Sequence, residues 1–447
     1  MLPLMHQPIT TTDNNLQGVQ FDEALHLDNL KKLSERPLCE LNLEEHPNLL
    51  VFPQDFKTHG DDIGKEHIFT IDSNLLKTGN LMGFVGYRNT KVRISSRFAQ
   101  DDKDYFLHYM LQKVFAINLF DLKYDSDSEG VFGFLIYLFP TFLKRAMRQG
   151  LYKEYQTRDY NDANIRGRID VSRHIRQNIP FAGKVAYSTR EYVSDNRITQ
   201  LVRHTIEYIA THPFSGNILN NDDETKEAVG VINAATSTYN RNDRQKVIYQ
   251  NLRPVSHPYF GEYRPLQRLC LQILRHEELK YGNDDNQIYG ILFDGAWLWE
   301  EYLDTILKPI GLIHTHNRTN NVGKHIFKAP RKVLAQPDFF IDGLAVFDAK
   351  YKRHKSLFDN EQREDRFQLL AYMHVFNAKV SGLIVPVSSS EPLFIEGEIS
   401  GRGGVMVLLG MNVGKQCQSF DNFVIEMKKE EWRLLEYVRE LVSEHSD

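Results

Sequence analysis

The residue types best suited to chemistry lie in the segment from Gln336 to Lys350, which contains Asp338, Asp348 and Lys350. Two carboxylates are a sufficient set of protein ligands for Mg²⁺, because this ion keeps several waters when it binds to proteins. A bound divalent cation lowers the pKa of water and neutralises charge on a phosphate. A lysine ammonium can hold the attacking water and stabilise the charged transition state. These residues together indicate metal-assisted phosphodiester hydrolysis, with Asp338 and Asp348 as the metal ligands.

Two short strands must position these groups. Apolar residues on both sides of Asp342-Gly343 predict a hairpin, and Asp348 and Lys350 project from the same face of its second strand. A two-residue turn would place Asp338 and Asp348 on opposite faces of the sheet. A three-residue loop with Gly343 in the left-handed conformation places them on the same face. We predict that Asp338 and Asp348 share a face, which requires an odd-numbered loop, such as this one, or a bulge.

Further polar groups lie in two predicted helices. Glu300 flanks a buried stripe and could supply a third carboxylate, or could simply be solvated. Asp365, Gln368 and Tyr372 share one face of a later helix. That face could hold Lys350 or bind a phosphate, and an ordinary polar stripe is the alternative. A surface hairpin is likewise the alternative for the acidic motif itself, because the motif is short.

Other motifs exclude several kinds of site. His314-Thr-His316 lacks a partner at metal-ligand spacing, which favours a loop over a zinc site. The sequence contains no Gly-x-x-x-x-Gly-Lys-Ser/Thr, so it predicts no P-loop nucleotide hydrolysis. Cys39, Cys270 and Cys417 lie far apart, which excludes a disulfide framework and a cysteine-rich metal site.

Composition indicates a multidomain soluble protein. The 447 residues exceed the length at which one hydrophobic core stops growing, so we expect two or three domains. Residues Met1–Thr12 do not resemble a signal peptide. The longest apolar run, Val131–Phe139, is too short to cross a bilayer. We expect a protein of the reducing cytoplasm that does not associate with a membrane.

The distribution of charge is uneven. The net charge is -5, but nine Lys or Arg residues and three acids lie between Arg318 and Lys355. A second basic stretch runs from Lys144 to Arg176. Clustered cations in an acidic chain are typical of a phosphate-binding surface, and for the second stretch solvated surface charge is an equal alternative.

Three regions are predicted along the chain. Residues 1–125 are expected to form an N-terminal α+β domain, with a strand at 91–95 and a helix capped by Asp101 or Asp102. Residues 126–285 are expected to form a basic region of helices and a long hairpin. We predict an apolar helix through Tyr137 and Phe142, hairpin strands at 165–171 and 184–192, and helices at 197–210 and 265–278.

Residues 286–447 form the third region. Its helices and strands alternate, which is typical of an α/β unit. We predict a helix at 295–308, strands within 333–351, a helix at 361–378, a strand at 383–387 and a final helix from about 428.

The order of these motifs resembles the McrC family, whose members are nuclease subunits of McrBC-type modified-cytosine restriction systems. The resemblance covers roughly residues 80–440 and is carried by four segments. They are Phe293–Leu303, Gln336-Pro-Asp338, Asp348-Ala-Lys-Tyr-Lys352 and Asp365–Tyr372. Residues Ile165–Asp170 and Ser194–Ile198 are similar to the middle region of that family.

The resemblance implies a C-terminal PD-(D/E)xK restriction-endonuclease-like domain, preceded by N-terminal α+β partner-binding regions. It implies Mg²⁺-dependent cleavage of double-stranded DNA, in complex with an AAA+ GTPase (McrB-like) that the chain stimulates. Asp338, Asp348 and Lys350 match the catalytic motif, and Glu300, Gln368 and Tyr372 would be accessory residues. Two alternatives stay open: a non-catalytic assembly factor with a vestigial nuclease fold, and another PD-(D/E)xK nuclease such as a RecB-like exonuclease.

Overall fold

The computed structural model describes most of the chain. The described residues are 8–34, 36–41, 48–53, 63–99, 104–115, 128–211, 218–220, 222–280, 288–315, 322–328, 333–353, 363–388, 393–401, 403–414 and 416–446. Among the helices in these ranges, none combines the length and apolar character needed to cross a lipid bilayer.

The chain forms two compact units, and the first of them is built from both ends of the sequence. Unit 1 comprises Met1–Tyr124 and Asp284–Asp447, and unit 2 comprises Asp125–Asn283. The chain therefore leaves and re-enters unit 1 close to the predicted boundaries at 125 and 285. However, the regions predicted as separate first and third domains are parts of one compact unit.

The reason is that a strand at the start of the predicted third region pairs with strands of the predicted first region. Strand β11 (Ile288–Asp294) pairs with β6 (Leu81–Tyr87) and β3 (Asn48–Phe52) in a five-stranded sheet of order β1-β7-β6-β11-β3. The other two strands of this sheet are β1 (Ile9–Thr12) and β7 (Thr90–Ser95). A small second sheet contains β2 (Val19–Gln20), β5 (Leu75–Lys77) and β4 (Thr70–Asp72).

Two helices belong to the N-terminal part, α1 (Glu23–Ser34) and α2 (Tyr105–Phe115). The apolar side chains of α2 are mostly buried, among them Phe106, Met110 and Phe115, and Val114 is partly exposed. The predicted cap was wrong for a local reason: the Asp104 carboxylate accepts the Leu107 N–H at 3.3 Å, so Asp104 caps the helix. Asp101 and Asp102 lie outside the described residues.

The C-terminal part of unit 1 contains a six-stranded mixed sheet of order β12-β15-β16-β17-β19-β18. Strand β16 is parallel to β17, and β17 is parallel to β19, so the carboxyl ends of these three strands meet at one edge. The strands are β12 (Ile313–His314), β15 (Phe339–Ile341), β16 (Ala345–Ala349), β17 (Val380–Val387), β18 (Leu393–Glu398) and β19 (Val405–Asn412). A separate pair is formed by β13 (Lys324–His325) and β14 (Leu334–Ala335).

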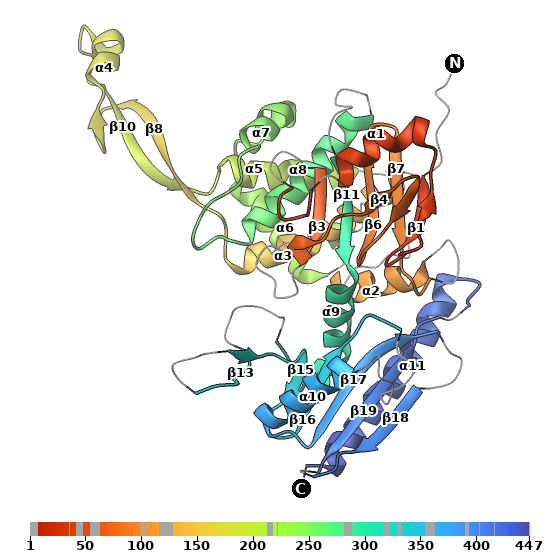
Figure 1. Cartoon of the computed structure of the whole chain (residues 1–447). Coiled ribbons are helices and arrows are strands. Elements are labelled where there is room, and N and C mark those ends of the chain that lie inside the picture. Colours follow the sequence, from red (N-terminus) through yellow and green to blue (C-terminus); the bar gives the residue numbers. More distant parts are fainter. Residues whose placement is uncertain are drawn as a thin grey trace. The chain divides into compact units, whose positions relative to one another are not determined.

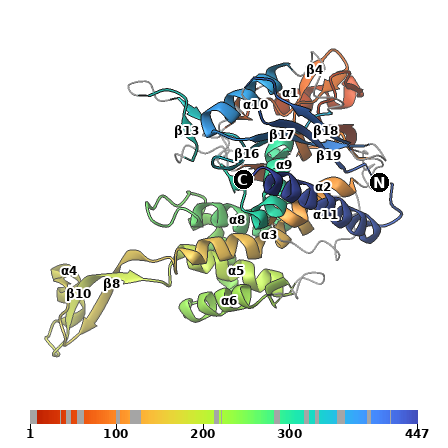
Figure 2. The same cartoon turned by 90° about the horizontal axis from the view of Figure 1, so that it is seen from below.

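Helices cover both faces of this sheet, as Figure 2 shows. Helix α10 (Arg363–Phe376) lies on one face, where Leu369 packs against Leu383 and Leu408. Helices α9 (Gly295–Leu307) and α11 (Phe420–Glu444) lie on the other face. The predicted helices at 295–308 and 361–378 are confirmed to within a turn. The final helix begins earlier than predicted, because Ser419 caps it by accepting the Asn422 N–H.

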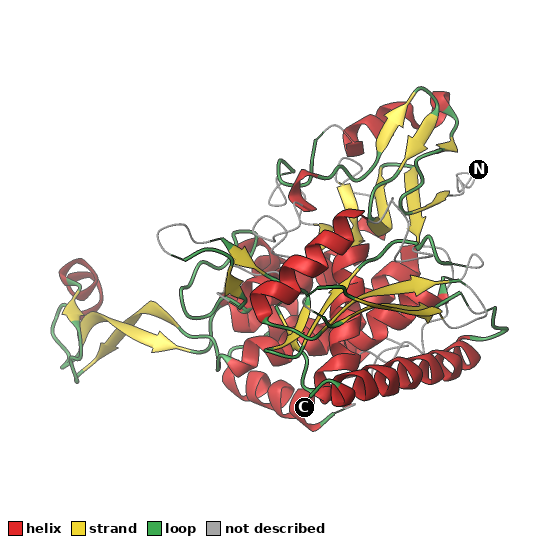
Figure 3. Cartoon of the chain, turned by 60° about the horizontal axis from the view of Figure 1, so that its bottom comes forward, coloured by secondary structure: helices red, strands yellow, loops and turns green. Residues whose placement is uncertain are grey.

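Unit 2 contains a long two-stranded arm with a short helix at its end (Figures 1 and 3). Strand β8 (Glu154–Asp162) pairs antiparallel with β10 (Val185–Val193), and β9 (Arg168–Ile169) adds one short pairing. The strand predicted at 165–171 is confirmed only at Arg168–Ile169, and the main partner of β10 is β8, which had not been predicted. Asp170 accepts the Arg173 N–H and starts helix α4 (Val171–Asn178), which ends the extended conformation.

The rest of unit 2 is helical. It comprises α3 (Ser128–Arg148), α5 (Arg197–Thr211), α6 (Asp223–Ala235), α7 (Arg244–Gln250) and α8 (Tyr263–Lys280). The helices predicted through Tyr137 and Phe142 and at 197–210 and 265–278 are confirmed, whereas α6 and α7 had not been predicted. Several cations of the second basic stretch form ion pairs within the unit, including Lys144 with Asp222 and Arg173 with Asp159. These pairs favour ordinary surface charge for that stretch.

Candidate active site

The hairpin that carries the acidic motif has the predicted register. Phe339 pairs with Phe347 and Ile341 with Ala345, which leaves a three-residue loop at 342–344. Gly343 has a φ of 75°, in the left-handed region that favours glycine. The register places Asp338 and Asp348 opposite each other, so the predicted shared face is confirmed, and a three-residue loop rather than a bulge produces it.

The two carboxyl groups lie against each other in a buried position. Asp338 is 7% exposed and Asp348 is 2% exposed. Their side chains are within hydrogen-bond reach of each other, and Asp338 Oδ2 also accepts the Ala349 N–H at 2.6 Å. Two adjacent buried carboxylates repel each other, so they must share a proton or a cation.

Lys350 supplies one positive charge beside this pair. Its Nζ lies 2.6 Å from Asp348 Oδ2, and the lysine side chain is 26% exposed. Burial alone would lower the pKa of Lys350, but the carboxylates of Asp348 and Asp338 outweigh it and raise that pKa above its usual value. The ammonium is therefore charged at neutral pH.

Burial has the opposite consequence for Asp348. It raises the pKa of the Asp348 carboxyl, although Lys350 opposes the shift. The nearby Asp365 carboxylate raises this pKa further. One ammonium therefore does not fully compensate the buried acids, which is the electrostatic condition under which a divalent cation is bound favourably.

Helix α10 fixes the chain just before Asp338. The Tyr372 hydroxyl donates to the Gln336 carbonyl at 3.2 Å, and Gln368 Nε2 donates to the Tyr372 oxygen at 3.0 Å. Burial and the carboxylates of Asp348 and Asp338 raise the pKa of Tyr372 to about 12, so the hydroxyl keeps its proton. The predicted polar face of this helix thus holds the backbone at Gln336, two residues before Asp338, whereas Lys350 is held by Asp348.

Asp365 is a site residue that the sequence analysis did not include among its catalytic candidates. It is 7% exposed, it acts electrostatically on both Asp348 and Lys350, and its Oδ2 lies 2.7 Å from Lys352 Nζ. The signal was present, because Asp365 shares a helix face with Gln368 and Tyr372. The ion pair with Lys352, however, joins helix α10 to the segment after β16, and a pattern within one helix cannot predict such a contact.

Glu300 is buried on α9 and faces a histidine. Its Oε2 lies 4.0 Å from His314 Nε2, and the His314 ring stacks on Phe339 at 4.7 Å. His314 lies in strand β12, so the predicted loop at this position was wrong. Within the described ranges, no three His, Cys, Asp or Glu residues are grouped to hold a metal ion. The third-carboxylate role of Glu300 therefore stays a prediction.

The backbone at the end of β16 is held by the neighbouring strand β17, which is itself contacted by helix α9. The Ile384 carbonyl accepts the Lys350 N–H at 3.0 Å and the Trp299 indole N–H at 3.2 Å. Trp299 on α9 is fully buried. This double contact ties the strand that carries Asp348 and Lys350 to the neighbouring strand β17 and to α9.

The donor set fits a hard divalent cation. Asp338 and Asp348 offer carboxylate oxygens on one face, and Mg²⁺ is typically bound by one or two carboxylates with water completing its octahedral shell. Around the site, Lys352 and Arg353 add positive charge. Such an arrangement can bind a cation and a phosphate together.

Comparison with known proteins gives a family and a fold. A family described as "McrBC 5-methylcytosine restriction system component" matches residues 76–386. One solved structure has a similar fold, with a TM-score of 0.50 and 16% sequence identity. It is a chain of the refined half-complex from a tetradecameric assembly of Thermococcus gammatolerans McrB AAA+ hexamers with bound McrC. The match covers 95% of this chain and 100% of that one.

A chain of the cryo-EM structure of the Thermococcus gammatolerans McrBC complex also matches, with 16% identity and a TM-score of 0.33. That match covers 68% of this chain and 87% of the other. No curated protein sequence matches this chain.

Proposed function

The chain belongs to the family of McrBC 5-methylcytosine restriction system components, and from this membership we propose that it is the nuclease subunit of a GTP-dependent restriction system. The observation that carries the proposal is the buried pair Asp338 and Asp348 with Lys350 at 2.6 Å. We propose that it cleaves double-stranded DNA with Mg²⁺ as cofactor, in the cytoplasm.

The six-stranded sheet with its flanking helices would be a PD-(D/E)xK restriction-endonuclease-like domain. In support, the acidic pair and the lysine lie on the hairpin β15–β16 and at its end, and helices cover both faces of the sheet. The motif order Pro337-Asp338 and Asp348-Ala-Lys350 agrees with this assignment. Residues 286–294 would not belong to the nuclease domain, because β11 is part of the N-terminal sheet.

Each residue would have a distinct part in hydrolysis. Asp338 and Asp348 would hold the Mg²⁺ ion, which supplies Lewis-acid activation of the phosphate and of the attacking water. Lys350 would orient that water and stabilise negative charge that develops on the phosphate. Gln368 and Tyr372 would position Asp338 through the Gln336 carbonyl, to which the Tyr372 hydroxyl donates. Asp365 would hold Lys352 beside the site.

The motor would be a separate AAA+ GTPase chain. The present sequence lacks a P-loop, so it has no such machinery of its own for nucleotide hydrolysis. The similar chain from Thermococcus gammatolerans comes from an assembly that contains McrB AAA+ hexamers. We propose that this chain binds such a hexamer and stimulates its GTP hydrolysis.

Plasmid cleavage tests this assignment. The chain is purified together with a candidate AAA+ GTPase partner and incubated with plasmid, GTP and Mg²⁺. Asp348→Asn, which keeps the side-chain shape, is expected to reduce cleavage by at least about 100-fold, because it removes a metal ligand. Asp342→Asn is the matched control, since Asp342 lies exposed in the loop of the same hairpin and pairs with the partly exposed Lys324. It should cleave at the wild-type rate.

The same experiment separates the alternatives. A non-catalytic assembly factor would stimulate GTP hydrolysis, and its Asp348→Asn variant would leave any cleavage unchanged. An exonuclease would degrade linear DNA and spare closed circles. Full stimulation of GTP hydrolysis together with loss of cleavage in Asp348→Asn supports the proposed function.

A further inference from the structure

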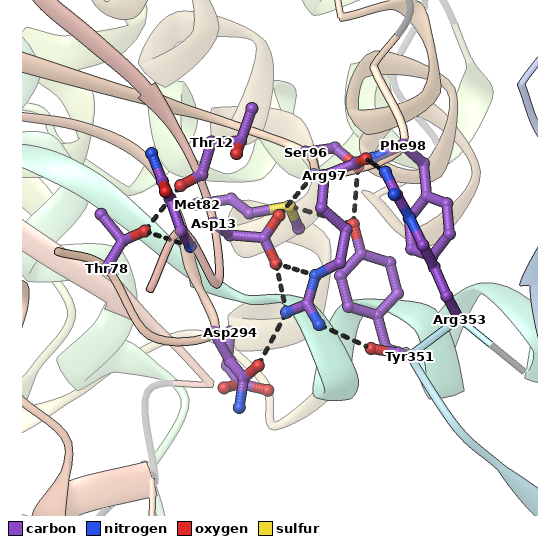
Figure 4. A network of polar contacts seen from close by, with 12 residues as sticks. Thr12, Asp13, Thr78, Met82, Ser96, Arg97, Phe98, Asp294, Tyr351 and Arg353 are labelled. Carbon is purple, nitrogen blue, oxygen red and sulfur yellow. Dashed lines mark hydrogen bonds and ion pairs between the residues drawn. The ribbon is translucent and has the colours of Figure 1, made fainter. Parts of the chain in front are cut away.

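Tyr351 follows Lys350 directly and is held by the N-terminal sheet of unit 1 (Figure 4). Its hydroxyl lies 2.6 Å from Ser96 Oγ, and its ring packs edge-on against Phe98 at 5.2 Å. Its carbonyl accepts a hydrogen bond from Arg97 Nη1 at 3.2 Å. The loop after β7 therefore contacts the hydroxyl, the ring and the backbone of this tyrosine.

Arg97 is in turn fixed by a buried ion pair. Its Nε donates to Asp13 Oδ2 at 2.7 Å, and its Nη2 donates to Asn80 Oδ1 at 2.7 Å. The Asp13 side chain is 0% exposed and that of Arg97 is 10% exposed. The guanidinium carbon also lies 4.9 Å from the centre of the Tyr351 ring. The guanidinium of Arg97 thus binds Asp13, Asn80 and the Tyr351 carbonyl at once, and these three contacts define its position.

Arg353, three residues after Lys350, makes a second contact with the loop that follows β7. Arg353 Nη2 donates to the Arg97 carbonyl at 2.8 Å. The ring of Tyr351 also excludes any side chain at Gly295, because a Cβ there would lie 2.7 Å from Tyr351 Cε1. The segment after Lys350 is thus in contact with the loop after β7 and with the start of α9.

The anchoring of Tyr351 affects Lys350, because in the described segment directly after β16 Lys350 is the last residue that bonds to the neighbouring strand. The Lys350 N–H donates to the Ile384 carbonyl, and the backbone after it leaves the sheet. The position of the lysine is therefore set by Asp348 on one side and by the anchored Tyr351 on the other. Buried ion pairs cost desolvation energy, and fixing a unique arrangement is one attested use of buried polar groups.

We propose that Arg97, held by Asp13, is a positioning residue for the nuclease site: it anchors Tyr351 and so keeps the Lys350 ammonium in register with Asp348. The proposal rests on the proposed function only for its catalytic consequence. A displacement of about 1 Å in a reacting group lowers an enzymatic rate on the order of 100-fold. The N-terminal sheet would thereby be part of the nuclease machinery.

The first test is single-turnover plasmid cleavage by the full chain with its AAA+ partner. The double variant Asp13→Asn/Arg97→Gln removes the anchor without leaving one buried charge unpaired. We expect its rate at saturating DNA and Mg²⁺ to fall about 10- to 100-fold, with unchanged half-saturation by DNA. Tyr351→Phe, which loses only the hydroxyl contact, should fall less. Lys77→Met removes an exposed ion pair of the same part of the chain and should leave the rate unchanged.

The second test does not need cleavage. Reductive methylation followed by mass spectrometry measures the reactivity of each lysine. Lys113 is the internal reference, because it is similarly exposed (31%) and forms a 2.8 Å ion pair with Glu431. The labelling ratio of Lys350 to Lys113 should rise several-fold in the double variant, whereas general destabilisation would expose both lysines alike.

The outcomes are distinguishable. A wild-type cleavage rate or an unchanged labelling ratio in the double variant overturns the positioning role of Arg97. If Asp348→Asn cleaves like wild type, the proposed function fails, and the labelling ratio still decides whether Arg97 positions Lys350.

Discussion

Asp338 and Asp348 face each other across the hairpin β15–β16, with their carboxyl groups within hydrogen-bond reach. This relationship depends on the three-residue loop at 342–344, because a loop shorter by one residue would turn one of the acids to the other face of the sheet. A local feature of the backbone thus places these two acids where they can share a cation.

Binding of Mg²⁺ should stabilise the wild-type chain. We expect its melting temperature to rise with Mg²⁺ concentration, by the equivalent of about 2.7 kcal/mol at a hundredfold excess over the dissociation constant. Asp338→Asn should lose this response, and Asp342→Asn should keep it. Differential scanning fluorimetry with and without EDTA measures the shift. An equal shift in all three proteins would contradict a metal site at the acidic pair.

Substitution of Gly343 tests the loop. Gly343→Ala should destabilise unit 1 by about 1–2 kcal/mol, because an L-residue is strained at positive φ. A Cβ at this position would meet nothing within 4 Å, so the loss reports backbone strain alone. Gly343→Asn should lose less, since Asn tolerates this conformation better. Denaturant unfolding measures both variants, and equal losses would refute the explanation.

Removal of the Tyr372 hydroxyl tests the contact between α10 and the chain before Asp338. Tyr372→Phe should lower the free energy of unfolding by about 1 kcal/mol and should reduce the cleavage rate. Tyr437→Phe is the control, because its hydroxyl makes a 3.4 Å contact with Glu396 at an exposed position. Its effect should stay within about 0.5 kcal/mol. Similar losses in both variants would argue against a special role for Tyr372.

The pH dependence of stability should depend on Asp104. Burial raises the pKa of this carboxyl from 3.8 to about 6, so the folded state binds its proton more tightly than the unfolded state. The resulting contribution to stability is complete below pH 3.8 and is lost as the pH rises through 6. From the shift of roughly two units, the loss is about 3 kcal/mol.

Asp104→Asn isolates this effect, because Asn also caps helices well. The free energy of unfolding of wild type minus that of the variant should fall as the pH rises from 4 to 7, and should be constant above that range. Denaturant titrations at several pH values measure the difference. A difference that does not change with pH would show that Asp104 does not titrate in this way.

Local patterns in the sequence determined much of the site. The period of two along a strand places Asp348 and Lys350 on one face, and Asp342-Gly343 indicates where the hairpin turns. The helices predicted at 197–210, 295–308 and 361–378 match α5, α9 and α10 to within a turn. These features could be predicted because they depend on backbone geometry within a few residues.

Only the tertiary structure decided the partners of these elements. It placed β11 in the N-terminal sheet, paired β8 with β10, and brought Arg97 to Tyr351 across 254 positions of sequence. Strand pairing and buried ion pairs form between residues far apart in the chain, and a short sequence pattern is compatible with many such partners. The shared face of the acidic hairpin was therefore predictable from its own residues, whereas its contacts with Asp365 and the N-terminal sheet depended on the fold.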